Sequence, residues 1–171
     1  MDTTFYCTYP TPLGAALVTA TADALTGLWF VDRQLYLPSE KEQASWIKRT
    51  DLPVLQATHD WLNAYFNGDK PLFDLKLAPA GSDFRQAVWN LLLKIPYGQT
   101  TTYGKLASEV QIIQSRIRPP AAQAVGGAVG HNPISLVIPC HRVVGANGQL
   151  TGYGGGLDRK EALLKLEGSL T

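Results

Sequence analysis

The spacing of the apolar residues changes part-way along this chain, and that change limits the folds that it can adopt. Residues 10–32, PTPLGAALVTATADALTGLWFVD, alternate apolar and polar positions, which is typical of an antiparallel hairpin or meander. Residues 84–95 repeat their apolar positions at helical spacing instead. A Pro/Gly connection at residues 79–82 separates the two patterns. We therefore expect an α/β (α+β) fold with two domains, residues 1–80 and 81–171.

The first domain carries one strong helical pattern. The apolar stripe of a helix within residues 52–69 consists of Leu55, Trp61, Leu62, Tyr65 and Phe66. The pair Asn67-Gly68 supplies a C-terminal stop for this helix. We expect a small domain of antiparallel sheet plus helix.

The second domain is predicted to be mainly helical. Ser82 or Asp83 can cap a first helix, with Phe84, Val88, Leu91 and Leu92 on its inner face and Pro96 at its end. A second helix begins near Thr101–Thr102, the segment IIQSRIRPP interrupts it, and AAQAVGGAVGHNP continues as a helix of small residues. Two short helices joined by a turn indicate a helix-turn-helix.

Two glycines in the small-residue helix require an explanation. Gly126 and Gly127 each cost about 1 kcal/mol of helix stability relative to alanine. One explanation is that a partner molecule must approach the helix surface closely. The alternative is tight packing of this helix against another helix.

The composition indicates a reduced, cytoplasmic protein. Hydrophobic residues make up 45% and charged residues 17%, with no signal-peptide pattern and no apolar run of about 18 residues for a membrane span. Two cysteines do not make a disulfide framework. Residues 1–80 carry 6 Lys/Arg and 9 Asp/Glu, whereas residues 81–171 carry 9 and 5. The positive second half suits an anionic partner, although chance partition would also produce this difference.

The segment VIPCHRVVGANGQLTGYGGG, residues 137–156, contains the residues best suited to chemistry. Cys140 could be a buried inert thiol, a metal ligand or a nucleophile. Structural zinc needs four Cys or His ligands, and two cysteines with three histidines in no paired spacing do not supply them, so we expect no metal. The run GYGGG lacks the context of a dinucleotide-binding loop.

Three neighbours favour the nucleophile. Pro139 is suited to the first position of a helical turn, which would place the Cys140 sulfur near free backbone N–H groups and lower the pKa of the thiol. His141 and Arg142 add polar or cationic groups. Adjacent residues on a helix do not face each other, so we expect a water to relay the proton between Cys140 and His141. Glu167 is the candidate carboxylate for the imidazole, and a solvated glutamate at a helix end is the alternative.

These residues carry a family resemblance. NPISLVIPCHRVVGANGQLTGYGGGLDRKEALLKLEG, with FRQAVWNLLLKIPYGQTTTYGKLA and AAQAVGGAVGHNP upstream, resembles the O6-alkylguanine-DNA alkyltransferases over residues 82–168. The resemblance implies a monomer that binds double-stranded DNA in the minor groove and flips the alkylated base out. It then moves the alkyl group irreversibly to Cys140 without a cofactor. O6-alkylguanine is the expected lesion, and O4-alkylthymine is a second candidate.

The resemblance also implies roles for individual residues. Cys140 is the acceptor, His141 the water-mediated base, Glu167 its orienting acid and Asn132 a brace for the reactive loop. The implied base pocket contains Tyr103, Val143, Tyr153, Gly154, Gly155 and Lys160. The expected DNA-binding residues are Arg116, Arg118, Ala121, Ala122, Gln123, Gly126, Gly127 and Arg142.

Two departures from the family pattern concern DNA binding. Gln123 stands where the family has an arginine that replaces the flipped base in the stack. The turn at residues 111–119 is longer than usual, and we expect Arg116 and Arg118 within it to take over contact with phosphate or the base stack. Two other functions remain open on the residues alone: a non-catalytic binder of alkylated DNA, and a cysteine hydrolase acting on an acyl substrate.

Overall fold

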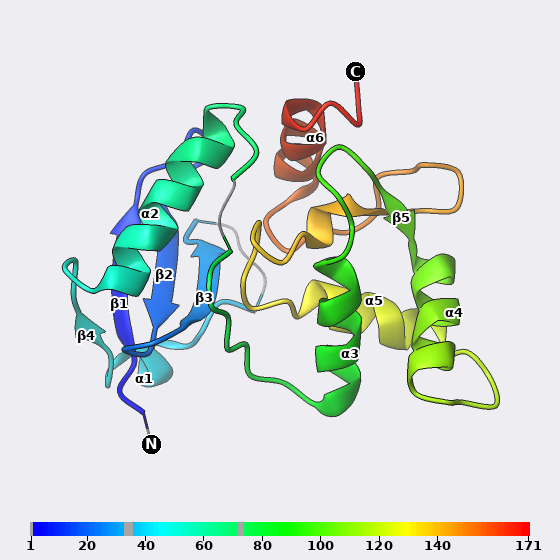
Figure 1. Ribbon diagram of the computed structural model, residues 1–171, viewed down its shortest axis with the longest axis horizontal. Helices are drawn as coiled ribbons and strands as arrows, with labels where there is room; N and C mark the ends of the chain where they lie inside the picture. The colour runs from blue at the N-terminus through cyan, green and yellow to red at the C-terminus, as the bar shows by residue number, and fades with distance from the viewer. Residues whose placement is uncertain (1, 33–35, 72–73) are drawn as a thin grey trace. The chain divides into compact units, whose positions relative to one another are not determined.

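The computed structural model describes residues 2–32, 36–71 and 74–171, and the chain divides into two compact units, residues 1–80 and 81–171 (Figure 1). Each unit has its own core. Among the described residues, none of the helices has the length and apolar character that crossing a membrane requires.

The first unit is built on a four-stranded sheet in the order β3-β2-β1-β4. The strands are β1 (Phe5–Tyr9), β2 (Ala16–Ala20), β3 (Leu25–Phe30) and β4 (Ile47–Lys48). β1 pairs antiparallel with β2, and β2 pairs antiparallel with β3, so the predicted meander is confirmed. β4 adds a short parallel edge beside β1, which the alternation of apolar residues did not predict because both residues of β4 are exposed.

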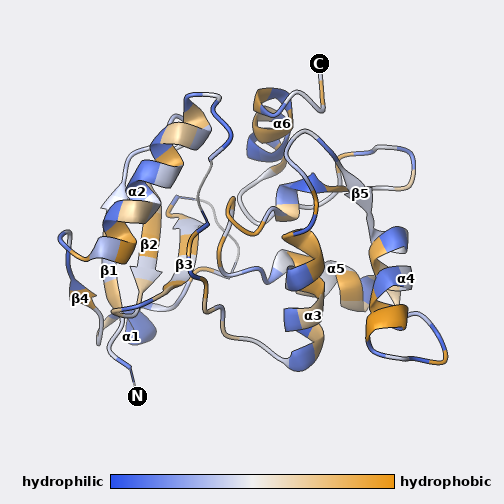
Figure 2. Ribbon diagram, in the orientation of Figure 1, coloured by the Kyte–Doolittle hydropathy of each residue, from blue (hydrophilic) through white to orange (hydrophobic). Residues whose placement is uncertain are grey.

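Helix α2 (Pro53–Phe66) covers this sheet, and a short helix α1 (Glu40–Gln43) precedes it. α2 begins at a proline and ends at Asn67, with Gly68 in the left-handed conformation at φ 84°, as predicted. The face toward the sheet is apolar in Figure 2 and buries Leu55, Thr58, Leu62 and Tyr65. Trp61 and Phe66, which were predicted on the apolar stripe, are only half-buried. Thr58 lies on the buried face in their place.

The second unit is mainly helical, as predicted. Its elements are α3 (Asp83–Leu92), β5 (Thr101–Thr102), α4 (Tyr103–Ile113), α5 (Ala122–Gly130), the 3-10 helix η1 (Cys140–Arg142), β6 (Val143–Val144) and α6 (Leu157–Leu166). α3, α4 and α5 pack against one another, and α4, the turn and α5 form the predicted helix-turn-helix. The hydroxyl of Ser82 caps α3 and that of Thr102 caps α4, each accepting from a backbone N–H three residues later.

Trp89 forms the centre of the helical core, a role that the predicted inner face of α3 left out. Its indole Nε1 donates to the carbonyl of Ala128 in α5 at 2.8 Å, and its side chain is buried. A Cβ at Gly81 would lie 2.4 Å from the Trp89 ring, so only glycine fits there. Phe84, expected on the inner face, is half-buried.

A two-stranded parallel pairing brings the candidate site together. β5 pairs with β6, with Thr101 opposite Val143 and Thr102 opposite Val144. β6 directly follows η1, which contains Cys140, and β5 directly precedes α4, which begins at Tyr103. This pairing therefore fixes the start of the helix-turn-helix beside the cysteine segment.

Candidate active site

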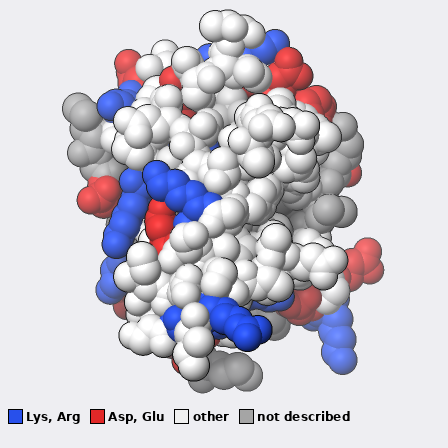
Figure 3. Space-filling view, turned by 90° about the vertical axis from the view of Figure 1, so that its right-hand side faces the viewer, with Lys and Arg blue, Asp and Glu red and all other residues white. Residues whose placement is uncertain are grey.

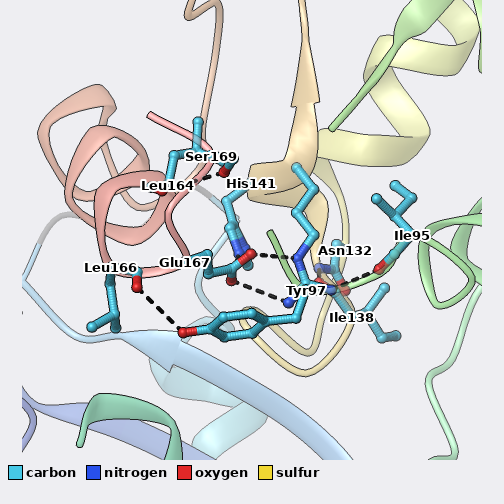
Figure 4. Close-up of polar contacts among 10 residues, drawn as sticks. Ile95, Tyr97, Asn132, Ile138, His141, Leu164, Leu166, Glu167 and Ser169 are labelled. Atoms are coloured by element: carbon cyan, nitrogen blue, oxygen red, sulfur yellow. Dashed lines mark hydrogen bonds and ion pairs between the residues drawn. The ribbon is translucent and has the colours of Figure 1, made fainter. Parts of the chain in front are cut away.

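The loop before Cys140 is held by the side chain of Asn132. Its amide Nδ2 donates to the carbonyl of Ile138 at 2.7 Å (Figure 4). Its Oδ1 accepts from the backbone N–H of Ile134 at 3.0 Å. Asn132 itself is buried, so both ends of the amide are satisfied inside the protein. The structure thus gives Asn132 the bracing geometry that the resemblance implied.

The backbone turns sharply just before the cysteine. Pro139 has φ −81° and ψ 65°, and the N–H of Cys140 donates to the carbonyl of Ile138 at 2.8 Å, which is an inverse γ-turn. η1 then begins at Cys140. The prediction that Pro139 is the first residue of the helical turn is therefore wrong by one position, because the γ-turn occupies it.

The pKa of Cys140 is raised, which corrects the sequence-based expectation of a lowered value. Burial of the thiol raises its pKa, against the opposing effects of the Asn132 side chain, the Lys160 ammonium group and the backbone N–H groups of Cys140 and His141. The backbone N–H groups were expected to favour the thiolate, whereas the contributions of Asn132 and Lys160 were not predicted. Cys140 is only 6% exposed, and at this burial desolvation outweighs them.

His141 and Glu167 form a buried pair. His141 Nε2 lies 2.6 Å from Glu167 Oε2, and neither side chain is exposed to solvent. The alternative of a solvated glutamate is therefore wrong: α6 ends at Leu166, and Glu167 at its C-cap points inward. His141 Nδ1 is buried and has no hydrogen-bond partner among the described residues.

Arg142 completes this arrangement from the other side of the carboxylate. Its Nε and NH2 donate to the two oxygens of Glu167 at 2.7 and 3.1 Å, and its NH1 donates to the carbonyl of Ile95 at 2.8 Å. Its guanidinium also lies 5.7 Å from the centre of the Tyr97 ring. Arg142 was predicted to contact DNA, but its donors are used inside the protein and its side chain is 11% exposed.

Burial and hydrogen bonds set the charge states of His141 and Glu167. Burial alone would raise the pKa of Glu167, but hydrogen bonds from His141 and Arg142 hold that pKa at about 2. Burial lowers the pKa of His141, and the hydrogen bond with Glu167 opposes this. Glu167 is therefore a carboxylate at neutral pH, and His141 is a neutral imidazole that can accept a proton.

Sequence reasoning missed Ile95 and Tyr97, which lie behind this pair. The Tyr97 hydroxyl donates to the carbonyl of Leu166 at 3.3 Å, and Gly98 adopts φ 84° close to the backbone of Glu167. A Cβ at Gly98 would lie 3.2 Å from the Glu167 carbonyl. The run Pro96-Tyr97-Gly98 is typical of a turn, but no local pattern marks its contacts with Leu166 and Glu167.

The predicted pocket residues gather around the loop at residues 151–155. Lys160, fully buried on α6, donates from Nζ to the carbonyls of Val143, Thr151 and Gly152. The Tyr103 hydroxyl donates to the same Thr151 carbonyl at 3.3 Å. Burial lowers the pKa of Lys160 to about 8, and the nearby Cys140 opposes this effect. One buried lysine therefore joins β6 to the glycine loop.

In the rest of the glycine loop, Tyr153 lies beside His141 and the two glycines that follow it are buried. The Tyr153 ring stands edge-on to the His141 ring with 6.5 Å between centroids, and its hydroxyl is buried beside Ser135. Gly154 and Gly155 are buried, and the Gly155 carbonyl accepts from Arg159 at 3.0 Å. The sequence analysis identified the glycines and Tyr153 but not Arg159.

The outer face of α5 has no covering inside its unit. Ala121, Ala122 and Gln123 are exposed, whereas Val125, Ala128 and Val129 face the core. A Cβ built at Gly126 or Gly127 would meet no heavy atom within 4 Å. The alternative that these glycines serve tight helix packing is therefore wrong, because the space beside them is open.

The two arginines of the turn differ in their contacts. The guanidinium of Arg116 lies 5.2 Å from the centre of the Phe84 ring, and its Nε donates to Gln114 at 2.8 Å. Arg118 is exposed. Both keep cationic groups at the surface of the helix-turn-helix.

The other histidines are engaged in structural contacts. His59 stacks on Tyr9 with 4.3 Å between ring centroids, and His131 Nδ1 lies 2.7 Å from the Gly127 carbonyl. In the part of the chain that the structure describes, no group of three or more His, Cys, Asp or Glu side chains is placed to hold a metal ion.

Comparisons with known proteins agree over the whole chain. The family model for the DNA binding domain of 6-O-methylguanine DNA methyltransferase matches residues 83–169, and the model for its ribonuclease-like domain matches residues 4–79. The methylated-DNA–protein-cysteine methyltransferase of Haemophilus influenzae is 42% identical over 98% of this chain and 88% of its own length. The protein of that name from Mycobacterium bovis is 45% identical over 96% of this chain and 92% of its own length.

Solved structures agree with this relationship. A crystal structure of Mycobacterium tuberculosis OGT in complex with DNA aligns with a TM-score of 0.82 at 43% identity, covering 96% of this chain and 93% of that one. The O6-methylguanine methyltransferase of the same organism aligns with a TM-score of 0.81 at 42% identity, covering 98% and 94%. This chain belongs to the methylated-DNA–protein-cysteine methyltransferase family.

Proposed function

We propose that this protein repairs alkylated DNA by moving the alkyl group of O6-alkylguanine to the sulfur of Cys140, once per molecule. The observation that carries the proposal is the buried series Cys140, His141 and Glu167, in which His141 bonds the carboxylate through Nε2 and leaves Nδ1 available. The family membership and the names of the relatives support the same reaction.

The chemistry follows from the charge states of these groups. The thiol is protonated at rest, because burial raises its pKa, and His141 is neutral. As the base docks, the thiol proton passes to His141 Nδ1 through a water, and Glu167 stabilises the imidazolium that forms. Asn132 and Lys160 stabilise the thiolate.

The transfer itself is an in-line displacement. The sulfur of Cys140 forms a bond to the alkyl carbon, the bond from that carbon to the guanine O6 breaks, and its electron pair stays on the base. The base then takes up a proton and becomes ordinary guanine, while the S-alkyl group remains on the protein. We propose that Tyr103 helps to neutralise the leaving base and that Tyr153, Val143 and the Gly154–Gly155 backbone line its pocket. O4-alkylthymine offers the same ether oxygen and is a second candidate substrate.

Access to the base requires DNA contact through the helix-turn-helix. We propose that the outer face of α5 enters the minor groove, because its exposed residues are small and the space beside Gly126 and Gly127 is open. Extruding a nucleotide costs a few kcal/mol. We propose that Gln123, which is exposed in the first turn of α5, hydrogen-bonds the base that loses its partner, and that the protein acts as a monomer with residues 1–80 as a supporting domain.

Intact-mass analysis with peptide mapping tests this proposal. The protein is mixed with a duplex that carries one O6-methylguanine, and Cys140→Ser is the matched control. We expect one added methylene on the peptide of Cys140 and none on that of Cys7, which is buried in the other unit. Tight binding of the lesion without an adduct would instead favour the non-catalytic damage binder.

A further inference from the structure

The turn between α4 and α5 carries apolar side chains that face solvent. Ile117 is 95% exposed, and Ile112 and Ile113 at the end of α4 are 77% and 53% exposed. An isoleucine with almost its whole surface in water contributes little to the stability of its own fold. Exposed apolar residues gathered in one place indicate an interaction surface.

The backbone of this turn is held in place, so Ile117 is presented outward. The N–H of Arg116 donates to the carbonyl of Gln111 at 2.9 Å, and the side chain of Gln111 donates to the carbonyl of Ile117 at 3.1 Å. The stack of Arg116 on Phe84 joins the turn to the start of α3. Ser115 adopts φ 51°, a conformation that a non-glycine residue keeps only where its surroundings fix it.

The charge around Ile117 points to an anionic partner. The sequence contains no Asp or Glu between Glu109 and Asp158, while Arg116 and Arg118 flank Ile117 directly. The side of the molecule that carries α4 shows separate groups of Lys and Arg, with some Asp and Glu among them, on a mainly uncharged surface (Figure 3). A turn that carries arginines and apolar side chains but no carboxylates is better suited to binding a nucleic acid than to facing water.

The turn also lies within reach of the helix that we place in the minor groove. Four residues lead from Ile117 to Ala121 at the start of α5, a span of at most about 14 Å even when fully extended. DNA that lies against Ala121 and Gln123 would therefore pass close to Ile117.

We propose that Ile117 is an apolar wedge that enters the minor groove next to the lesion, with Arg118 on the neighbouring phosphate. This inference rests on the proposed function. Minor-groove proteins use apolar side chains in this way to unstack a base step and bend the duplex. Such a wedge lowers the free-energy cost of extruding the damaged base. It also supplies stacking surface, of which Gln123 has less than an arginine would have.

The experiment uses the full chain and a lesion duplex with 2-aminopurine at the base steps beside O6-methylguanine. Wild type, Ile117→Ser and the control Ile47→Ser, at an exposed isoleucine of β4 in the other unit, are compared for 2-aminopurine fluorescence, duplex affinity and single-turnover transfer. Loss of one inserted side chain is expected to weaken duplex affinity and slow transfer about tenfold. In Ile117→Ser the fluorescence increase of the wild type is expected to vanish. Ile47→Ser should behave like the wild type, and Ile117→Leu should restore the signal.

The outcomes separate the wedge from the repair activity. If the wild type transfers the methyl group and Ile117→Ser matches Ile47→Ser in all three measurements, the wedge is wrong and the proposed function stands. If Ile117→Ser instead changes only the oligomeric state in sedimentation, the isoleucines bind a second copy and the wedge is again wrong. If the wild type forms no adduct on Cys140, the proposed function fails and the wedge fails with it.

Discussion

The surroundings of Cys140 and the outer face of α5 belong to one compact unit but are built in opposite ways. Around the cysteine, Asn132, Glu167 and Lys160 each make two or more hydrogen bonds, and all three are buried. The outer face of α5 presents small side chains with open space beside Gly126 and Gly127. The hydrogen bonds of Asn132, Glu167 and Lys160 are made inside the protein and leave His141 Nδ1 unpaired among the described residues, whereas the outer face of α5 gains contacts only from a partner molecule.

This difference indicates that the surroundings of Cys140 serve alkyl transfer and that the outer face of α5 serves DNA binding. A site whose groups are already bonded has little reorganisation left at the moment of reaction, which suits proton transfer and displacement. A bare helix surface with glycines suits close approach to a duplex of any sequence. We therefore expect changes in the first region to alter transfer, and changes in the second to alter DNA binding.

Cys140→Ser should have the largest effect on transfer and little effect on binding. The serine hydroxyl keeps the size of the site but is a far weaker nucleophile than a thiol. We expect no detectable transfer, together with wild-type affinity for the lesion duplex in a fluorescence anisotropy titration. A loss of affinity equal to the loss of transfer would show that the two regions are not separable.

Glu167→Gln should slow transfer and destabilise the protein. General acid–base catalysis contributes about 10²–10⁴-fold, and the glutamine cannot stabilise the imidazolium of His141. Removing one partner of a buried pair typically costs about 3–5 kcal/mol, because Arg142 keeps its charge. Single-turnover kinetics and urea unfolding measure the two effects. Transfer at the wild-type rate would remove Glu167 from the mechanism.

The stability difference between the wild type and Glu167→Gln should decrease as the pH falls. The pKa of Glu167 falls from 4.5 to about 2 on folding, so its stabilising contribution is complete above pH 4.5 and is lost as the pH falls toward 2. The difference in unfolding free energy between wild type and Glu167→Gln should therefore shrink between pH 5 and pH 2. A constant difference over this range would contradict the buried pair.

Arg142→Gln tests whether Arg142 serves alkyl transfer by orienting Glu167 or serves DNA binding by contacting a phosphate. If it orients Glu167, the variant should slow transfer about tenfold at saturating DNA, with an unchanged salt dependence of duplex affinity. If Arg142 contacts a phosphate, the slope of log affinity against log salt should fall by about 1. Affinity titrations at several salt concentrations distinguish these two roles.

Gly127→Leu tests the bare face of α5. The new side chain meets nothing within 4 Å of its Cβ, and a helix interior gains up to about 1 kcal/mol when glycine is replaced by a better helix former. We expect a thermal midpoint at or above that of the wild type and a duplex affinity lowered about tenfold or less. A lowered midpoint would mean that the glycine serves the fold after all.

Gln123→Arg should have the smallest effect and the opposite direction. An arginine at this exposed position adds one phosphate or stacking contact, so duplex affinity and transfer should rise severalfold at low salt. Anisotropy titrations and single-turnover rates measure this gain. An unchanged transfer rate would indicate that the turn at residues 111–119 already supplies what the glutamine lacks.

Much of this arrangement was predictable from the sequence, and the failures have physical reasons. The caps Ser82 and Thr102 and the stop at Asn67-Gly68 are local, so the sequence predicted them correctly. The direction of the Cys140 pKa was wrong because burial depends on distant residues that pack around the loop. The partners of Arg142 lie 25 and 47 residues away, at Glu167 and Ile95, and no local pattern marks such contacts.

The most direct test of the account is the number of lesions repaired per protein molecule in the presence of excess duplex with O6-methylguanine. Because the S-alkyl group on Cys140 has no group in the mechanism to remove it, repair should stop at one equivalent, with the methyl group on Cys140. Continued turnover would contradict irreversible transfer and favour a hydrolytic reaction, and repair without an adduct on Cys140 would contradict its role as the acceptor.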